Sequence, residues 1–112
     1  MSNAPAVDAK PGFAIALIEH TQWCDAIHRY IHAVQATFEP FGGRFRVHGG
    51  PLEVLEGQQE GAVVVVEFPS LLHARRWYQS PAYQAILPLR ADHTRGTVLL
   101  VEGVASGYQA RV

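Results

Sequence analysis

The sequence predicts a single α+β domain with an antiparallel sheet, and three patterns in its 112 residues support that prediction. Amphipathic stretches with helical spacing separate short apolar runs, and glycine and proline stand at the junctions between them. The apolar runs are rich in β-branched residues and are too short for helices. We therefore interpret them as buried strands at residues 13–20, 62–68 and 97–103.

Length and composition limit the domain plan and the partners. A chain of this size forms one domain, which we expect at residues 13–104, between a flexible lead-in at 1–12 and a tail at 105–112. The net charge of -1 provides no basic field for nucleic acid or anionic lipid. The longest unbroken apolar run, residues 13–18, is too short for a membrane span. We expect no nucleic-acid partner and no membrane partner.

The first helix is predicted directly after the first strand. Thr21 follows that strand at once and has the chemistry of an N-cap. Pro40 and the pair Gly42-Gly43 are expected to end the helix, because glycine readily adopts the positive φ of a helix stop. Apolar side chains recur between these points at steps of three and four and form one stripe: Trp23, Ile27, Tyr30, Ile31, Val34 and Phe38.

The run RFRVH at residues 44–48 predicts a half-buried strand. Strict alternation places Phe45 and Val47 on one face and His48 on the other. Residues 49–51, Gly-Gly-Pro, then predict a turn or bulge in this strand, after which LEVLEG at 52–57 resumes strand-like character. A phosphate-binding glycine loop should lead from a strand into a helix, so this context excludes one here.

The second half of the chain predicts two helical segments between strands. Ser70 is the expected N-cap of the first, and Ser80-Pro81 repeats the signal for the second, which contains Pro88. Gly96 is expected to end this segment before the last strand. The resulting order, strand, helix, strand pair, helix, helix, strand, is the split βαβ plan of ferredoxin-like domains.

The apolar runs also predict an assembly. The helices of so short a chain cover only one face of the sheet, yet the runs at 63–66 and 98–101 are apolar on both parities. The other face therefore needs a cover, and we expect a homodimer packed sheet against sheet.

Several stretches together resemble a known family, the uncharacterised domain of unknown function 1330 of the dimeric α+β barrel superfamily. The resemblance spans about residues 13–104 and implies the ferredoxin-like fold and the dimer. It carries over no catalytic residue, and members of the family often have arginine at the position of His48. The stretches are FGGRF at 41–45, HGGPLEVLEG at 48–57, VVEFPS at 65–70, WYQSPAYQ at 77–84, PLR at 88–90 and VEG at 101–103. The superfamily includes cofactor-independent monooxygenases, lactone isomerases and haem-binding proteins, which use the cleft between sheet and helices.

Elimination narrows the possible chemistry. Lys10, the only lysine, lies in the lead-in, and Ser70 and Ser80 are occupied as caps, so lysine and serine nucleophiles are disfavoured. Cys24 is the only cysteine; it is expected to act as a small apolar residue on the first helix, and a lone cysteine fits a reducing compartment, which indicates the cytoplasm. His28 and His32 are one helical turn apart but lack a third ligand, so we expect no metal or other cofactor. Haem binding through a histidine stays open, although nothing selects it.

Two residues are candidates for a catalytic site. His48 ends a strand at a glycine break, where a bulge can direct a side chain into a cleft. The alternative for His48 is an exposed partner of a glutamate such as Glu53. Arg90 could clamp a carboxylate or enolate oxygen. The alternative for Arg90 is a salt bridge to Glu67 or Glu102.

Aromatic residues on the second and third helical segments complete the candidate site. Trp77, Tyr78 and Tyr83 are expected in the core, and the same side chains would line an apolar pocket. The first functional hypothesis is therefore a domain that binds a small acidic or aromatic ligand in the cleft between sheet and helices, with a cofactor-independent enzyme as its catalytic form. The second is a dimeric binding or interaction module without catalysis.

Overall fold

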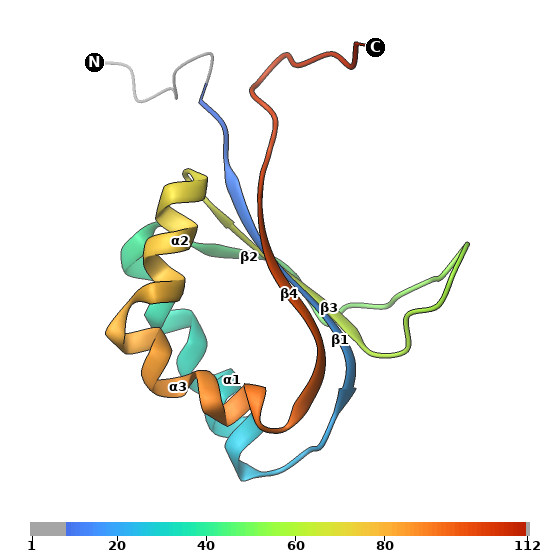
Figure 1. Cartoon of the computed structure of the whole chain (residues 1–112), viewed down its shortest axis with the longest axis vertical. Coiled ribbons are helices and arrows are strands. Elements are labelled where there is room, and N and C mark those ends of the chain that lie inside the picture. The colour runs from blue at the N-terminus through green and yellow to red at the C-terminus, as the bar shows by residue number, and fades with distance from the viewer. Residues whose placement is uncertain (1–8, 112) are drawn as a thin grey trace.

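The computed structural model describes residues 9–111 of the chain. These residues form a four-stranded antiparallel sheet with helices on one face (Figure 1). The strand order across the sheet is β2-β3-β1-β4, as the split βαβ plan requires. Most of the lead-in expected at 1–12, and the last residue of the tail, lie outside the described residues. The strands are β1 (Gly12–Thr21), β2 (Arg44–His48), β3 (Ala62–Phe68) and β4 (Thr94–Glu102).

Most helix ends lie where local chemistry predicts them. Ser70 Oγ accepts a hydrogen bond from the His73 N–H, and Ser80 Oγ accepts one from the Tyr83 N–H, so both predicted N-caps are confirmed. Gly42 has a φ of 77°, the left-handed conformation that stops a helix. The helical elements are α1 (Asp25–Phe38), the 3-10 helix η1 (Glu39–Phe41), α2 (Leu71–Gln79) and α3 (Pro81–Ala91), which continues through Pro88.

The predicted N-cap at Thr21 is wrong. Thr21 is the last residue of β1 and pairs with Thr94 of β4. The first helix begins later, at Asp25, and Cys24 occupies the N-cap position without a side-chain cap hydrogen bond. Strand pairing therefore continues past the point where local chemistry favoured a cap.

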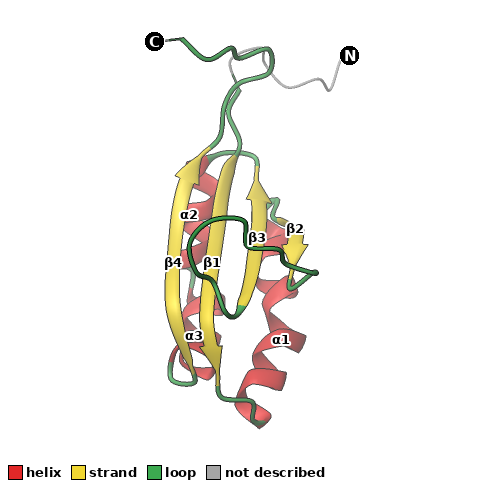
Figure 2. Ribbon diagram, turned by 90° about the vertical axis from the view of Figure 1, so that its right-hand side faces the viewer, coloured by secondary structure: helices red, strands yellow, loops and turns green. Residues whose placement is uncertain are grey.

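Two other boundary predictions are wrong as well. Gly96 does not end α3 but lies within β4, where it pairs with Ile18. The apolar run at residues 52–57 forms no strand and belongs to the loop between β2 and β3. This loop lies on the side of the sheet opposite the helices (Figures 1 and 2), and Leu55 within it is 86% exposed.

A β-bulge in β2 determines where His48 points. The register with β3 shifts between Phe45 and Val47, which leaves Arg46 as an extra residue. Alternation alone placed Phe45 and His48 on opposite faces, and that prediction is wrong. The bulge brings both to the same face, where their rings stack with centroids 4.2 Å apart and 4° between their planes.

The core is built mainly at one end of the helical layer. Phe38, at the C-terminal end of α1, and Phe68 of β3 are fully buried, with Trp77 and Tyr83 beside them. Elsewhere α1 packs mainly against α3 and not directly on the strands. The N-terminal half of α1 therefore leaves space between itself and the sheet.

No helix of residues 9–111 covers the second face of the sheet, which we call the open face (Figure 2). Because side chains alternate along a strand, the neighbours of the buried positions Ala14 and Val66 point to this face. Leu99 and Val101 are 37% and 42% exposed there. The apolar side chains of the open face are Phe13, Ile15, Leu17, Val47, Val63, Val65, Leu99 and Val101.

Replacing Gly96 by alanine is expected to destabilise the fold. A Cβ atom at this position would overlap the backbone carbonyl oxygen of Leu17, which the pairing of β1 and β4 holds in place. We expect Gly96→Ala to lower the free energy of unfolding by roughly 1–3 kcal/mol in a urea titration. Gly50→Ala is the matched control, because Gly50 has open space around it and no positive φ. Equal stability of the two variants would contradict the close approach at Gly96.

Candidate functional site

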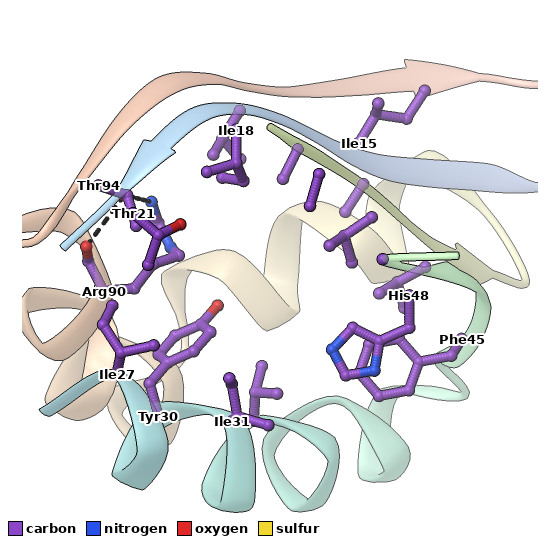
Figure 3. Close-up of a pocket in the computed structure, with 18 of the residues that line it drawn as sticks. Ile15, Ile18, Thr21, Ile27, Tyr30, Ile31, Phe45, His48, Arg90 and Thr94 are labelled. Atoms are coloured by element: carbon purple, nitrogen blue, oxygen red, sulfur yellow. Dashed lines mark hydrogen bonds between the residues drawn. The ribbon is translucent and has the colours of Figure 1, made fainter. Parts of the chain in front are cut away.

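A cavity of about 340 Å³ lies between the sheet and α1 (Figure 3). Its volume falls at the small end of the range of ~300–1,000 Å³ that is typical of ligand pockets. The walls are mainly apolar, because the strands present small or branched side chains and α1 presents its apolar stripe. The sheet contributes Ala14, Ala16, Ile18, Val64 and Val66, and α1 contributes Ile27, Tyr30, Ile31 and Val34.

One end of the pocket holds a half-buried guanidinium group. Arg90, in the last turn of α3, lies beside Thr21 and Thr94, where β1 ends and β4 begins (Figure 3). The Thr94 hydroxyl donates to the Arg90 backbone carbonyl at 3.0 Å and accepts from Arg90 Nη1 at 3.4 Å. The guanidinium carbon also lies 5.7 Å from the centre of the Tyr30 ring, within cation–π range. The pairing of β1 with β4 and the last turn of α3 thus fix this end of the pocket.

Arg90 forms neither of the ion pairs considered from the sequence. Glu67 binds Arg46 at 2.7 Å on the open face, and Glu102 lies 3.9 Å from Lys10. Within residues 9–111, no carboxylate oxygen lies within 4.0 Å of Arg90. Among these residues the guanidinium group therefore has neighbouring hydroxyl groups but no ion-pair partner.

Two tyrosine hydroxyls lie next to this charge. Tyr30 Oη and Tyr83 Oη are 2.9 Å apart and share a hydrogen bond. Burial raises the pKa of Tyr30 far above its usual range, and the Tyr83 hydroxyl adds to the rise, which Arg90 opposes only in part. Burial acts to lower the pKa of Arg90, but Tyr83 and Tyr30 outweigh it and the net direction is upward. Arg90 stays charged and Tyr30 stays neutral across the physiological pH range.

His48 borders the opposite end of the pocket. Figure 3 shows it stacked on Phe45 and across the cavity from Arg90. The imidazole is exposed, and in residues 9–111 no carboxylate, Glu53 included, lies within ion-pair distance of it. The structure therefore places His48 and Arg90 on one cavity but not side by side.

The three predicted aromatic residues divide between the pocket wall and the packing behind it. Trp77 and Tyr83 line the cavity, whereas Tyr78 contacts both of them from outside it. Trp77 also donates its Nε1–H to Thr37 Oγ1 at 3.0 Å, which ties α2 to α1. Trp77 therefore has a structural role in addition to its place in the wall.

Three residues of the site were missed by sequence reasoning. Tyr30 was counted only as part of the apolar stripe, although it carries the one hydroxyl of that stripe. Thr21 was assigned to a helix cap, and Thr94 lay before Gly96, the expected end of the helical segment, and so outside the predicted strand at 97–103. In the split βαβ order the first and last strands are neighbours, so correct strand ends would have brought these two threonines together.

Comparison with known proteins identifies the family. The family model described as domain of unknown function DUF1330 matches residues 11–104. The chain belongs to this family. A search of curated proteins found no match.

Solved structures similar to this DUF1330 domain share its fold. RPA0582 from Rhodopseudomonas palustris, a protein of unknown function, is 21% identical with a TM-score of 0.60, and 84% of this chain and 81% of that chain are covered. A dimeric ferredoxin-like protein of unknown function from Thermobifida fusca is 17% identical with a TM-score of 0.55, with coverage of 93% and 99%. One from Jannaschia, described in the same words, is 14% identical with a TM-score of 0.56, with coverage of 82% and 96%. The predicted ferredoxin-like fold is confirmed.

Two other features of this DUF1330 chain bear on function. Residues 9–111 contain no group of three or more His, Cys, Asp or Glu side chains arranged to hold a metal ion. None of the helices in that part of the chain has the length and apolar character needed to cross a bilayer.

The buried tyrosine pair predicts a loss of stability at alkaline pH. Tyr30 keeps its proton in the folded protein, whereas in the unfolded chain it ionises near pH ~10. Its contribution is therefore fully present below pH ~10 and is lost above it, by up to about 1.4 kcal/mol per pH unit. Urea titrations between pH ~9 and ~11 should show that Tyr30→Phe flattens this dependence, whereas Tyr108→Phe, at an exposed position, does not. Parallel pH profiles for wild type and Tyr30→Phe would contradict the assignment.

Proposed function

We propose that this domain binds a small organic ligand, acidic or aromatic, in the pocket between the sheet and α1. The observation that carries the proposal is a half-buried arginine without an acidic partner within the described residues, set in an otherwise apolar cavity of ligand size. A charge in such surroundings is expensive to leave unpaired. A bound anion would compensate it.

In the catalytic form of this proposal, the two ends of the pocket have different roles. Arg90 clamps an anionic oxygen of the ligand, and His48 carries a proton at the other end. Trp77 and Tyr83 form part of the apolar wall, and Tyr78 supports both from behind. The reaction would be a cofactor-independent proton transfer.

The second candidate is a dimeric module that binds without catalysis. It is favoured by the position of His48, which is exposed and has no carboxylate within ion-pair distance among residues 9–111 to orient its ring. A general base is usually held by such a partner. Under this candidate Arg90 keeps its role, and His48→Ala leaves ligand affinity unchanged.

Filling the pocket should weaken ligand binding. Ala16 lines the cavity, so Ala16→Leu is expected to occupy part of its volume and to weaken binding about tenfold or more. Ala85→Leu, on an exposed position of α3, is the matched control. The assay is ligand-observed NMR with a panel of neutral aromatic compounds and organic acids, after native mass spectrometry has identified any co-purifying molecule. Hits that bind Ala16→Leu as well as wild type, or a panel without hits, would count against the proposal.

A homodimer packed through the open face is the assembly we propose for the domain. The open face presents Leu99 and Val101 to solvent, and the loop between β2 and β3 carries the exposed Leu52, Val54 and Leu55 on the same side (Figure 2). Apolar surface of this extent is usually covered. The Thermobifida and Jannaschia proteins are themselves described as dimeric, which supports the proposal.

A charged side chain placed on the open face should therefore dissociate the dimer. Leu99→Asp places a carboxylate within the expected interface, and we expect the dimer dissociation constant to rise about tenfold or more. Leu72→Asp is the matched control, because Leu72 is exposed to a similar degree but lies on α2, on the helical side. Sedimentation velocity at micromolar concentration measures the oligomeric state of wild type and of both variants. A monomeric wild type, or an unchanged dimer of Leu99→Asp, contradicts the proposed interface.

We also propose residues 13–104 as the functional domain and the cytoplasm as its location. The family match at 11–104 and the single cysteine, Cys24, support these two inferences. The net charge of -1 supports a function without nucleic acid.

A further inference from the structure

The charge distribution in the pocket restricts the ligand further, provided that the proposed ligand site is correct. Among the residues that line the cavity within 9–111, Arg90 is the only one with a permanent charge. The two carboxylates considered as its partners from the sequence, Glu67 and Glu102, are engaged elsewhere. The pocket therefore offers one positive charge and accepts one negative charge.

The hydrogen-bond donors around Arg90 suit a planar anion. Thr94 already donates its hydroxyl hydrogen to the Arg90 carbonyl, so it has none left for a ligand. The Tyr30 and Tyr83 hydroxyls use one of their two hydrogens between themselves, which leaves one to donate. A guanidinium fork with this tyrosine donor and the Thr21 hydroxyl beside it matches the two oxygens of a carboxylate.

The position of Arg90 in its helix disfavours a dianion. It lies in the last turn of α3, where the carbonyl groups at the helix end create a partial negative charge. Phosphate sites usually lie at the opposite end of a helix, its N-terminus, or in glycine-rich loops. A single negative charge is compensated by Arg90, and a second one would meet the unfavourable end of the helix dipole.

Among the described residues, no polar side chain lines the middle of the cavity to receive a second charged group. Between the Arg90 end and the His48 end, the wall is formed by Ala14, Ala16, Val64, Val66, Ile31 and Val34. An apolar ligand body buried against this wall gains free energy in proportion to its buried area. A charged group in the same place would lose its hydration without a partner.

We propose that the ligand is an amphipathic monocarboxylic acid. Its carboxylate binds at Arg90, between the end of β1 and the start of β4, and its apolar body extends along the sheet toward His48. Dicarboxylates, phosphates and neutral analogues bind more weakly.

Calorimetry with three probes of equal chain length tests the inference. Octanoate is the acid, octanamide its neutral analogue, and suberate the dicarboxylate. We expect octanoate to bind wild type at least about tenfold more tightly than either of the others. Arg90→Met should remove that preference and leave octanamide unaffected. Arg76→Met is the matched control, because Arg76 is an exposed arginine in the last turn of α2, away from the pocket.

The outcomes separate this inference from the proposed function. Octanamide or suberate binding as tightly as octanoate in wild type overturns the inference, and so does a preference that Arg90→Met retains. The comparison in wild type decides the matter even where Arg90→Met fails to fold. In each of these cases the proposed function is retained if wild type binds compounds from the ligand-observed NMR panel and Ala16→Leu does not.

Discussion

The packing of Phe38 against the sheet is the contact on which the rest of the structure depends. This side chain is fully buried at the C-terminal end of α1, and its ring meets Phe45 edge-on at 4.9 Å and Trp77 at 6.2 Å. It joins β2, α1 and α2 at one point. Because α1 is held to the sheet there and to α3 elsewhere, its N-terminal half can stand off the strands without unfolding. The pocket is the space that this arrangement leaves.

The bulge at Arg46 links the two faces of the sheet. Without the extra residue, Val47 would share the pocket face with Phe45 and His48 would point to the open face, as alternation predicts. With it, Val47 lies on the open face and His48 reaches the pocket, while Arg46 can bind Glu67. One irregularity in a short edge strand therefore supplies both the border of the pocket and an ion pair at the margin of the open face.

Local chemistry predicted the elements well and the irregular contacts poorly. Ser70 and Ser80 act as caps because a cap needs only the residues next to it. Thr21 has the same chemistry, but Thr94, far away in sequence, pairs with it and extends the strand. Gly96 fails for a related reason, since the close backbone of Leu17 requires a glycine there. The residue type of Arg90 made it a candidate from the sequence, whereas its place beside Tyr30 depends on the packing of α1 against α3.

Arg90 and His48 differ in burial and charge, so the two ends of the pocket are chemically different. Arg90 is half-buried, permanently charged and fixed by Thr94, so it can hold an anion in one place without exchanging protons. His48 is exposed and stacks on the face of Phe45, so this end of the pocket is in contact with water. Under the proposed function, a ligand held by its charge at the Arg90 end would present its other end to His48. Any chemistry would then take place away from the anionic group, and without such chemistry the same asymmetry would set the orientation of the ligand.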